Sequence, residues 1–189
     1  GSVTFGNGTG DTTTFTGGVT ATAPSQVNLA GTIQTTNTLM SLGDAGTPVV
    51  LTANTILSGN TAGAITLGGT VNGAYSLTIN TTGTTTLSGD IGGNTALTTL
   101  TTNTGGTTVI SVDIETSSTQ TYNDAVTING TLDFTGSTVQ FANTLAGDDG
   151  TGDNLTISGA LDLDGEATSL TSLTVEGTSN LGADVTTSG

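Results

Sequence analysis

The stretch SVDIETSST at residues 111–119 alternates apolar and polar side chains, and similar phrases recur in the chain. AGTIQTTNT at 30–38 has a related pattern, and GADVTTSG at 182–189 repeats it at the end of the sequence. Alternation with a period of two residues is typical of a β-strand that buries one face. A phrase that returns along a chain indicates a repeat architecture, in which stacked units bury a continuous core.

Alignment of the three phrases brings Ile33, Ile114 and Val185 to one position. Other phrases recur in the same order, for example SLTIN at 76–80 and NLTIS at 154–158. The chain then comprises about two and a half imperfect repeat units of about 71–81 residues, each of several coils. We predict that residues 1–189 form a single β-solenoid segment of a longer array and that the three aligned side chains point inward.

Short alternating runs occur along the whole chain, separated by the pairs NG, GG, GD, SG and TG, which are typical of turns. Val, Ile and Thr dominate these runs, and such β-branched residues favour strands. The runs lie at 3–5, 49–52, 64–67, 76–80, 107–115, 125–128, 131–134, 138–141, 154–157, 160–164 and 172–175. Since no stretch has helical periodicity and the strand groups are spaced about 18–25 residues apart, the sequence predicts an all-β solenoid.

The composition favours a narrow core. Of 189 residues, 48 are threonine and 30 glycine, and the aromatic residues are two tyrosines and four phenylalanines. A β-sandwich would need larger inward residues, and a propeller would need a regular aromatic signature. A parallel β-helix accepts small residues because its coils stack about 4.8 Å apart. We therefore predict a parallel β-helix whose threonines form ladders on the outside.

Three segments carry a resemblance to known proteins. Residues 75–111, 118–128 and 170–189 resemble the β-strand repeats of filamentous-haemagglutinin-like and autotransporter-type bacterial surface adhesins. This resemblance implies a right-handed parallel β-helix, secretion to the bacterial cell surface, and a role as a stalk, fibre or adhesive surface. It also implies a host or neighbouring-cell surface, or a carbohydrate, as partner. Members of this family usually carry lysines, whereas this chain has none.

The charge excludes several classes of function. The chain has no Lys, Arg, His or Cys, and its formal net charge is −15. Nucleic acid and anionic membrane surfaces are excluded as partners because no cation can pair with phosphate. No run approaches 18 apolar residues, so we predict no membrane insertion. A nucleophilic triad would lack its base, and phosphoryl transfer would lack its cationic clamp.

Carboxylates concentrate late in the chain, where two groups follow each other. The six candidate metal ligands are Asp148, Asp149, Asp153, Asp162, Asp164 and Glu166. Oxygen-only groups of this kind suit Ca²⁺, the one cofactor that we consider. The segment DDGTGDNL at 148–155 is not an EF-hand loop, and Thr151 stands where the GGxGxD motif of calcium β-rolls has glycine. Two interpretations stay open, a Ca²⁺ site and a solvated acidic turn.

The preferred function is that of an extracellular, non-enzymatic structural protein, a segment of a bacterial adhesin or filament shaft. Strand edges at the ends of a solenoid pair readily with further strands, so we expect self-association along the fibre axis. One alternative is a calcium-dependent component of a surface layer or matrix.

Two further alternatives rest on particular residues. A carbohydrate-active enzyme could use paired carboxylates among Asp162, Asp164 and Glu166, since Asp162 and Asp164 project to one side of a strand. Such a site would also need aromatic platforms, for which only Tyr75 and Tyr122 are at hand. Ice or crystal-surface binding would need flat threonine ladders, and the irregular repeat length argues against them.

Overall fold

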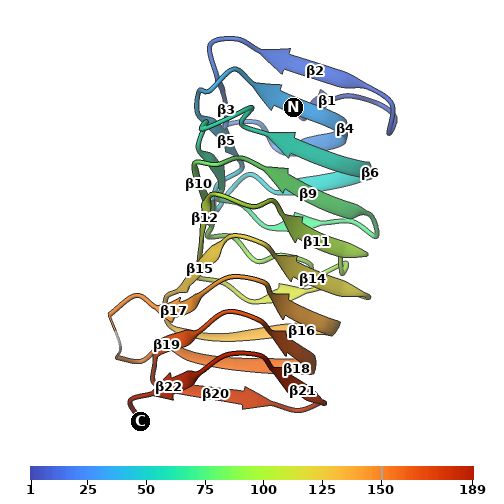
Figure 1. Ribbon diagram of the computed structural model, residues 1–189. Coiled ribbons are helices and arrows are strands. Elements are labelled where there is room, and N and C mark those ends of the chain that lie inside the picture. The colour runs from blue at the N-terminus through green and yellow to red at the C-terminus, as the bar shows by residue number, and fades with distance from the viewer. Residues whose placement is uncertain (150) are drawn as a thin grey trace.

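The chain folds as a parallel β-solenoid of about eight turns in the computed structural model, which describes residues 1–149 and 151–189. Figure 1 shows the turns stacked one on another from the N-terminal end to the C-terminal end. No helix occurs among the described residues. The all-β, right-handed parallel β-helix predicted from the sequence is thus confirmed.

The strands belong to two parallel sheets. The 13-stranded sheet consists of β1 (Val3–Phe5), β2 (Thr12–Phe15), β4 (Val27–Thr35), β6 (Val49–Ser58), β8 (Val71–Asn72), β9 (Ser76–Asn80), β11 (Thr99–Thr102), β13 (Ile114–Glu115), β14 (Thr119–Tyr122), β16 (Thr131–Phe141), β18 (Asn154–Leu163), β20 (Ser172–Val175) and β21 (Ser179–Leu181). The nine-stranded sheet consists of β3 (Val19–Ala21), β5 (Met40–Leu42), β7 (Ile65–Leu67), β10 (Thr84–Leu87), β12 (Thr107–Ile110), β15 (Ala125–Ile128), β17 (Leu145–Gly147), β19 (Ala167–Leu170) and β22 (Val185–Thr187).

Inward side chains stack in columns, because each strand pairs in register with the strand one turn later. The first column runs through Val3, Val27, Val49, Val71, Ile91, Ile114, Phe134, Ile157 and Val175. The sequence separation of its successive members stays within the predicted coil length of about 18–25 residues, which is thereby confirmed. Stacking of like apolar side chains at the strand spacing buries a continuous core.

Two more columns line the remaining faces of the coil. The second column runs through Thr13, Ile33, Leu57, Ile79, Thr102, Tyr122, Phe141, Leu163 and Leu181. The third column runs through Val19, Met40, Ile65, Thr85, Thr108, Val126, Leu145, Ala167 and Val185.

The predicted equivalence of Ile33, Ile114 and Val185 is wrong, because the three residues lie in the second, first and third columns respectively. Ile33 and Ile114 are buried as predicted, whereas Val185 is 37% exposed in the last turn. All three faces require the same alternation of apolar and polar residues. A recurring phrase therefore marks a strand without identifying its face, and the structural period is one coil.

Three strand predictions also need correction, and one of them concerns the runs 154–157 and 160–164, which form the single strand β18. The run 107–115 divides into β12 and β13, because the chain turns a corner between the third and first columns. The runs 131–134 and 138–141 join instead into the single strand β16, whose register shifts between Thr135 and Thr138. Alternation alone does not show where a solenoid bends.

The core holds an aromatic cluster. The rings of Tyr122 and Phe141 stack with centroids 5.1 Å apart, and Phe134 lies 5.9 Å from Tyr122. The Tyr122 hydroxyl donates to Gln120 Oε1 at 2.9 Å, and Gln120 Nε2 donates to the Thr135 carbonyl at 2.9 Å. Burial raises the pKa of Tyr122 well above its usual value. These hydrogen bonds satisfy the polar groups that the core would otherwise leave unpaired.

Threonines occupy both faces of the strands. Thr78, Thr101 and Thr121 pair in successive turns on the polar face of the 13-stranded sheet, as predicted for an outward ladder. Thr85 and Thr108 are fully buried in the third column, which the sequence analysis did not predict. The outward ladder is bounded by Ile56 and by Gln140, so it forms no continuous threonine array.

Candidate metal centre

The turn between β17 and β18 brings three carboxylates together. Asp148 continues the β17 pairing, since its N–H donates to the Ile128 carbonyl at 3.0 Å. Asp149 accepts at Oδ1 from both the N–H and the hydroxyl of Thr151, each at 2.8 Å. Gly152 follows with φ at +79°, a conformation that favours glycine, and directs Asp153 inward.

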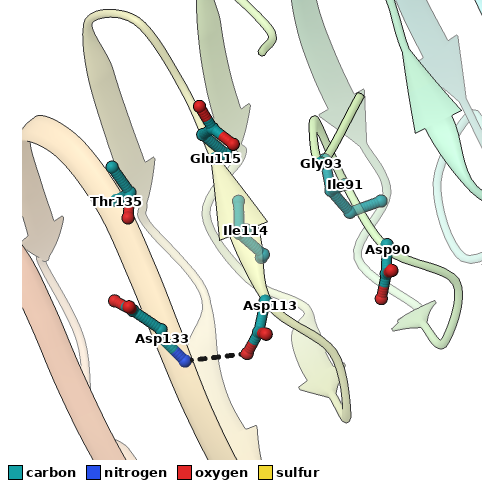
Figure 2. Close-up of a pocket in the computed structure, with 8 residues that line it drawn as sticks. All are labelled: Asp90, Ile91, Gly93, Asp113, Ile114, Glu115, Asp133 and Thr135. Carbon is teal, nitrogen blue, oxygen red and sulfur yellow. Dashed lines mark hydrogen bonds between the residues drawn. The ribbon is translucent and has the colours of Figure 1, made fainter. Parts of the chain in front are cut away.

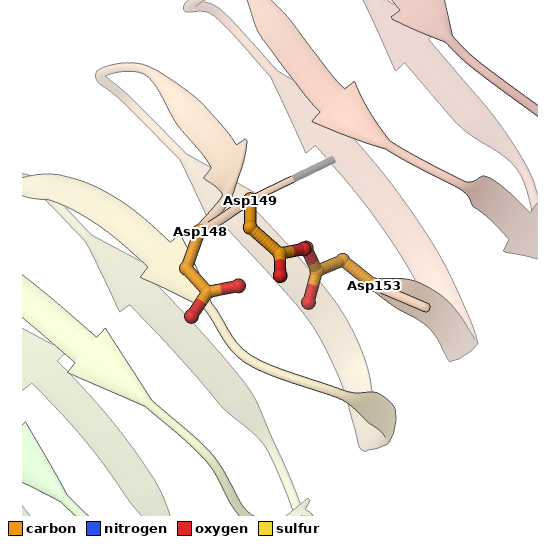
Figure 3. A group of neighbouring side chains, drawn as sticks. All are labelled: Asp148, Asp149 and Asp153. Atoms are coloured by element: carbon orange, nitrogen blue, oxygen red, sulfur yellow. The ribbon is translucent and has the colours of Figure 1, made fainter. Parts of the chain in front are cut away.

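The carboxylates of Asp148, Asp149 and Asp153 face a common point. One oxygen of each lies within 4.8 Å of the corresponding oxygens of the other two. Figure 3 shows the carboxylates of Asp149 and Asp153 turned toward each other, with that of Asp148 beside them. Asp148 and Asp149 are exposed, whereas Asp153 is only 1% exposed. The first half of the predicted ligand set thus forms a compact group.

Hydrogen bonds engage one oxygen of each carboxylate. Asp148 Oδ2 accepts from Asn129 Nδ2, and Asp153 Oδ1 accepts from the Gly130 N–H at 2.8 Å. The two bonds from Thr151, of which the N–H contributes more, lower the pKa of Asp149. Asp153 Oδ2 is buried and has no hydrogen-bond partner among the described residues. The group therefore keeps oxygens that can serve as ligands.

Asp153 fits because Gly147 has no side chain. A Cβ at Gly147 would lie 2.6 Å from Asp153 Oδ2 and 2.1 Å from the Ser169 carbonyl oxygen. Gly147 continues the inward row that contains Ile128, so Asp153 occupies space that a core side chain would fill. The Asp153 carboxylate is buried because it packs against this inward row.

The second half of the predicted set lies elsewhere. Asp162 and Asp164 both accept from Gln140 Nε2 at 3.2 Å, which confirms that they project to the same side. Asp162 also accepts from Asn180 Nδ2 at 2.8 Å. Glu166 is exposed, and its backbone carbonyl accepts from the Leu145 N–H. Among the described residues, the 148/149/153 group is the one set of three or more carboxylates that lie close enough together to share an ion.

An acidic groove lies beside the first column of the solenoid (Figure 2). It has a volume of about 230 Å³ and is lined by Asp90, Ile91, Gly93, Asp113, Ile114, Glu115, Asp133 and Thr135. Asp90, Asp113 and Asp133 each precede a member of the first column by one residue, so they form a ladder in three successive turns. The Asp133 N–H donates to Asp113 Oδ1 at 2.9 Å.

This ladder of aspartates was not predicted from the sequence. Its only signal is that the three aspartates recur at intervals of one coil, which becomes meaningful only when the register is known. Like charges on neighbouring strands repel and destabilise the pair, which the hydrogen bond between the two turns partly offsets.

The tyrosines do not form the aromatic platform that a carbohydrate site would need. Tyr122 is fully buried in the aromatic cluster, and Tyr75 is 39% exposed. The groove is lined instead by carboxylates, aliphatic side chains and Thr135.

Comparison with known proteins gives no match: no family model, no curated protein and no solved structure resembles this chain significantly. Among the described residues, no helix has the length and apolar character needed to cross a membrane.

Proposed function

We propose that the chain is a structural shaft, a segment of an extracellular bacterial adhesin or filament whose stacked coils form a stiff rod. The observation that carries this proposal is the unbroken first column, which holds Val, Ile or Phe in every turn. Backbone hydrogen bonds between turns run along the axis, so bending the rod would strain many of them together. The resemblance to adhesin repeats supports the surface location.

Axial self-association is part of this proposal. The last turn exposes two residues that belong to inward columns, Leu181 at 53% and Val185 at 37%. The strands β21 and β22 each pair with an earlier strand on one side only. A second copy stacked on this turn would cover the two side chains and pair the strand edges. Net charge of −15 opposes side-by-side bundling.

Sedimentation velocity and negative-stain electron microscopy of the chain test the proposal. We expect concentration-dependent lengthening of rods at constant width. Leu181→Glu should weaken it by placing a charge on the end surface, whereas Leu39→Glu should not. Leu39 is a matched control because it is 50% exposed but lies on the side of an early turn, before β5. A monomer at high concentration, with and without divalent ions, would contradict axial association.

A further inference from the structure

We propose that Asp148, Asp149 and Asp153 bind one Ca²⁺, which neutralises the buried carboxylate and fastens the turn between β17 and β18 to the neighbouring coils. This inference goes beyond the proposed shaft, because a solenoid rod needs no bound ion. It rests on two independent observations, the convergence of three carboxylates and the unpartnered buried oxygen of Asp153.

Burial of the Asp153 carboxylate has a free-energy cost. A carboxylate removed from water is strongly destabilising unless hydrogen bonds or an opposite charge compensate it. Asp153 Oδ1 has the Gly130 N–H, but Oδ2 has no partner among the described residues, and the side chain is only 1% exposed. Asp124 is also 1% exposed, yet both of its oxygens accept hydrogen bonds. The missing hydrogen bond is therefore a feature of Asp153 and is not shared by the buried Asp124.

The side chains of the protein supply no positive charge to this group. The sequence contains no Lys, Arg or His, so no side chain can form an ion pair with these carboxylates. The nearest charged neighbours are the like-charged Asp148 and Asp149, whose repulsion adds to the cost at Asp153. A cation from solution is the remaining partner that compensates all three charges at once.

The chemistry of the three ligands favours Ca²⁺. Hard oxygen donors suit Ca²⁺ and Mg²⁺ rather than transition metals. Ca²⁺ accepts six to eight oxygens at about 2.3–2.6 Å in flexible geometry, whereas Mg²⁺ demands near-ideal octahedral geometry at about 2.0–2.1 Å. The three ligand oxygens lie within 4.8 Å of one another, and two of them are on an exposed turn. Water can complete the flexible coordination that Ca²⁺ accepts.

The turn that carries the three carboxylates is hydrogen-bonded to the coils on both sides. The group already contacts the preceding coil through Asn129 and Gly130. It contacts the following coil through Thr171, whose N–H donates to the Asp153 carbonyl at 2.8 Å and whose hydroxyl accepts from the Gly152 N–H at 2.8 Å. An ion held by this turn would therefore resist separation of three successive coils.

Isothermal titration calorimetry and thermal unfolding test the inference, using the whole chain freed of divalent ions by chelation and studied at physiological ionic strength. We expect one Ca²⁺ per chain and a melting midpoint that rises by about 5–10 °C when free Ca²⁺ is about one hundred times Kd. Mg²⁺ should bind at least tenfold more weakly than Ca²⁺. Equal or tighter Mg²⁺ binding would contradict the selection of Ca²⁺.

Variants assign the effect to the site. Asp149→Asn changes an exposed residue, so the chain should fold in chelator while Ca²⁺ affinity falls at least tenfold. Asp153→Asn should abolish binding and melt at a higher temperature than the original chain in chelator, because the unpaired charge is gone. Asp162→Asn and Asp124→Asn serve as half-buried and buried controls and should leave affinity unchanged.

Three results would overturn the inference: absent heat with an unchanged melting midpoint at millimolar Ca²⁺, unchanged affinity in Asp149→Asn, or an equal loss of affinity in Asp162→Asn. The last would assign the heat to general condensation of cations on an acidic surface. Because calorimetry is performed at concentrations where sedimentation shows monomer, failure of this site is distinguishable from failure of axial association.

Discussion

Asp124 and Asp153 are both 1% exposed, but the two regions around them satisfy a buried aspartate in different ways. Asp124 Oδ1 accepts from the Gly106 N–H at 2.9 Å, and its Oδ2 accepts from the Thr108 hydroxyl at 3.3 Å. Asp153 Oδ1 likewise accepts from a glycine N–H, that of Gly130, but its Oδ2 has no partner among the described residues.

The two regions differ in the side chains that lie beside the buried carboxylate. Beside Asp124, the third column carries Thr108, whose hydroxyl supplies the second hydrogen bond. Beside Asp153, the inward row carries Gly147, which makes room for the carboxylate but offers no side-chain donor. A solenoid can therefore bury a carboxylate by itself where a threonine faces it. Where a glycine faces it, an external partner is needed, which supports the proposed Ca²⁺ site.

The largest effect is expected from filling the space beside each aspartate. Gly147→Ala should destabilise the chain by about 3 kcal/mol or more, because its Cβ would meet the Ser169 carbonyl oxygen at 2.1 Å and Asp153 Oδ2 at 2.6 Å. Gly106→Ala should cost less, since its nearest contacts are carbonyl oxygens at 2.6 and 2.7 Å and Asp124 Oδ2 lies 3.2 Å away. Urea unfolding of both variants in chelator measures the difference.

Gly17→Ala provides the control for this pair, because a Cβ there meets nothing within 4 Å and its φ is not positive. We expect its free energy of unfolding to stay within about 0.5 kcal/mol of the original. If Gly106→Ala proves as damaging as Gly147→Ala, close packing against the aspartate would not distinguish the two regions.

The comparison also shows what the sequence could predict. The alternating runs at 3–5, 125–128 and 172–175 coincide with β1, β15 and β20, because period-two burial is a local property. The proximity of Asp148, Asp149 and Asp153 follows from their closeness in the chain. The local pattern also indicated the coil length, since every turn of the solenoid must return to the same face.

The remaining features depend on the register between coils, which no local pattern contains. The burial of Asp153 is set by Gly147 and Gly130, which are brought beside it by strand pairing. The ladder of Asp90, Asp113 and Asp133 likewise exists only once the first column is known. Because the coil length varies from one turn to the next, this register is hidden from sequence reasoning.

A second prediction concerns the pH dependence at Asp124. Burial raises the pKa of Asp124, and the hydrogen bonds from Gly106 and Thr108 only partly oppose this. The folded pKa is thus above the unfolded value, so the folded chain binds the proton more tightly. The stabilisation from this proton is fully present below the unfolded pKa and is lost as pH rises through the folded pKa.

Asp124→Asn removes this titration and is the direct test. We expect the original chain to gain stability relative to the variant as pH falls from 7 toward 4. This gain in the free energy of unfolding should be smaller than the loss caused by the Gly147→Ala and Gly106→Ala substitutions. Urea unfolding of both proteins in chelator at several pH values measures the relative change. A constant difference between them across this range would show that Asp124 titrates alike in both states, and the account of its burial would be wrong.

The smallest effect is expected at the exposed end of the metal group. The Thr151 N–H and hydroxyl lower the pKa of Asp149, and the N–H contributes more. Thr151→Val removes the hydroxyl and keeps the N–H, so the pKa should move part of the way back toward its usual value, with little change in overall stability. Thr151→Ser keeps both donors and should leave the pKa unchanged. Carboxyl-carbon NMR titration of Asp149 in chelator measures these pKa values.

The pH dependence of stability at Asp149 has the opposite sign to that at Asp124. The stabilisation is present above the unfolded pKa and is lost as pH falls through the lowered folded pKa. A Val variant that titrates like the original would show that the hydroxyl contributes nothing, and an equal shift in the Ser variant would assign the effect to the shape of the turn.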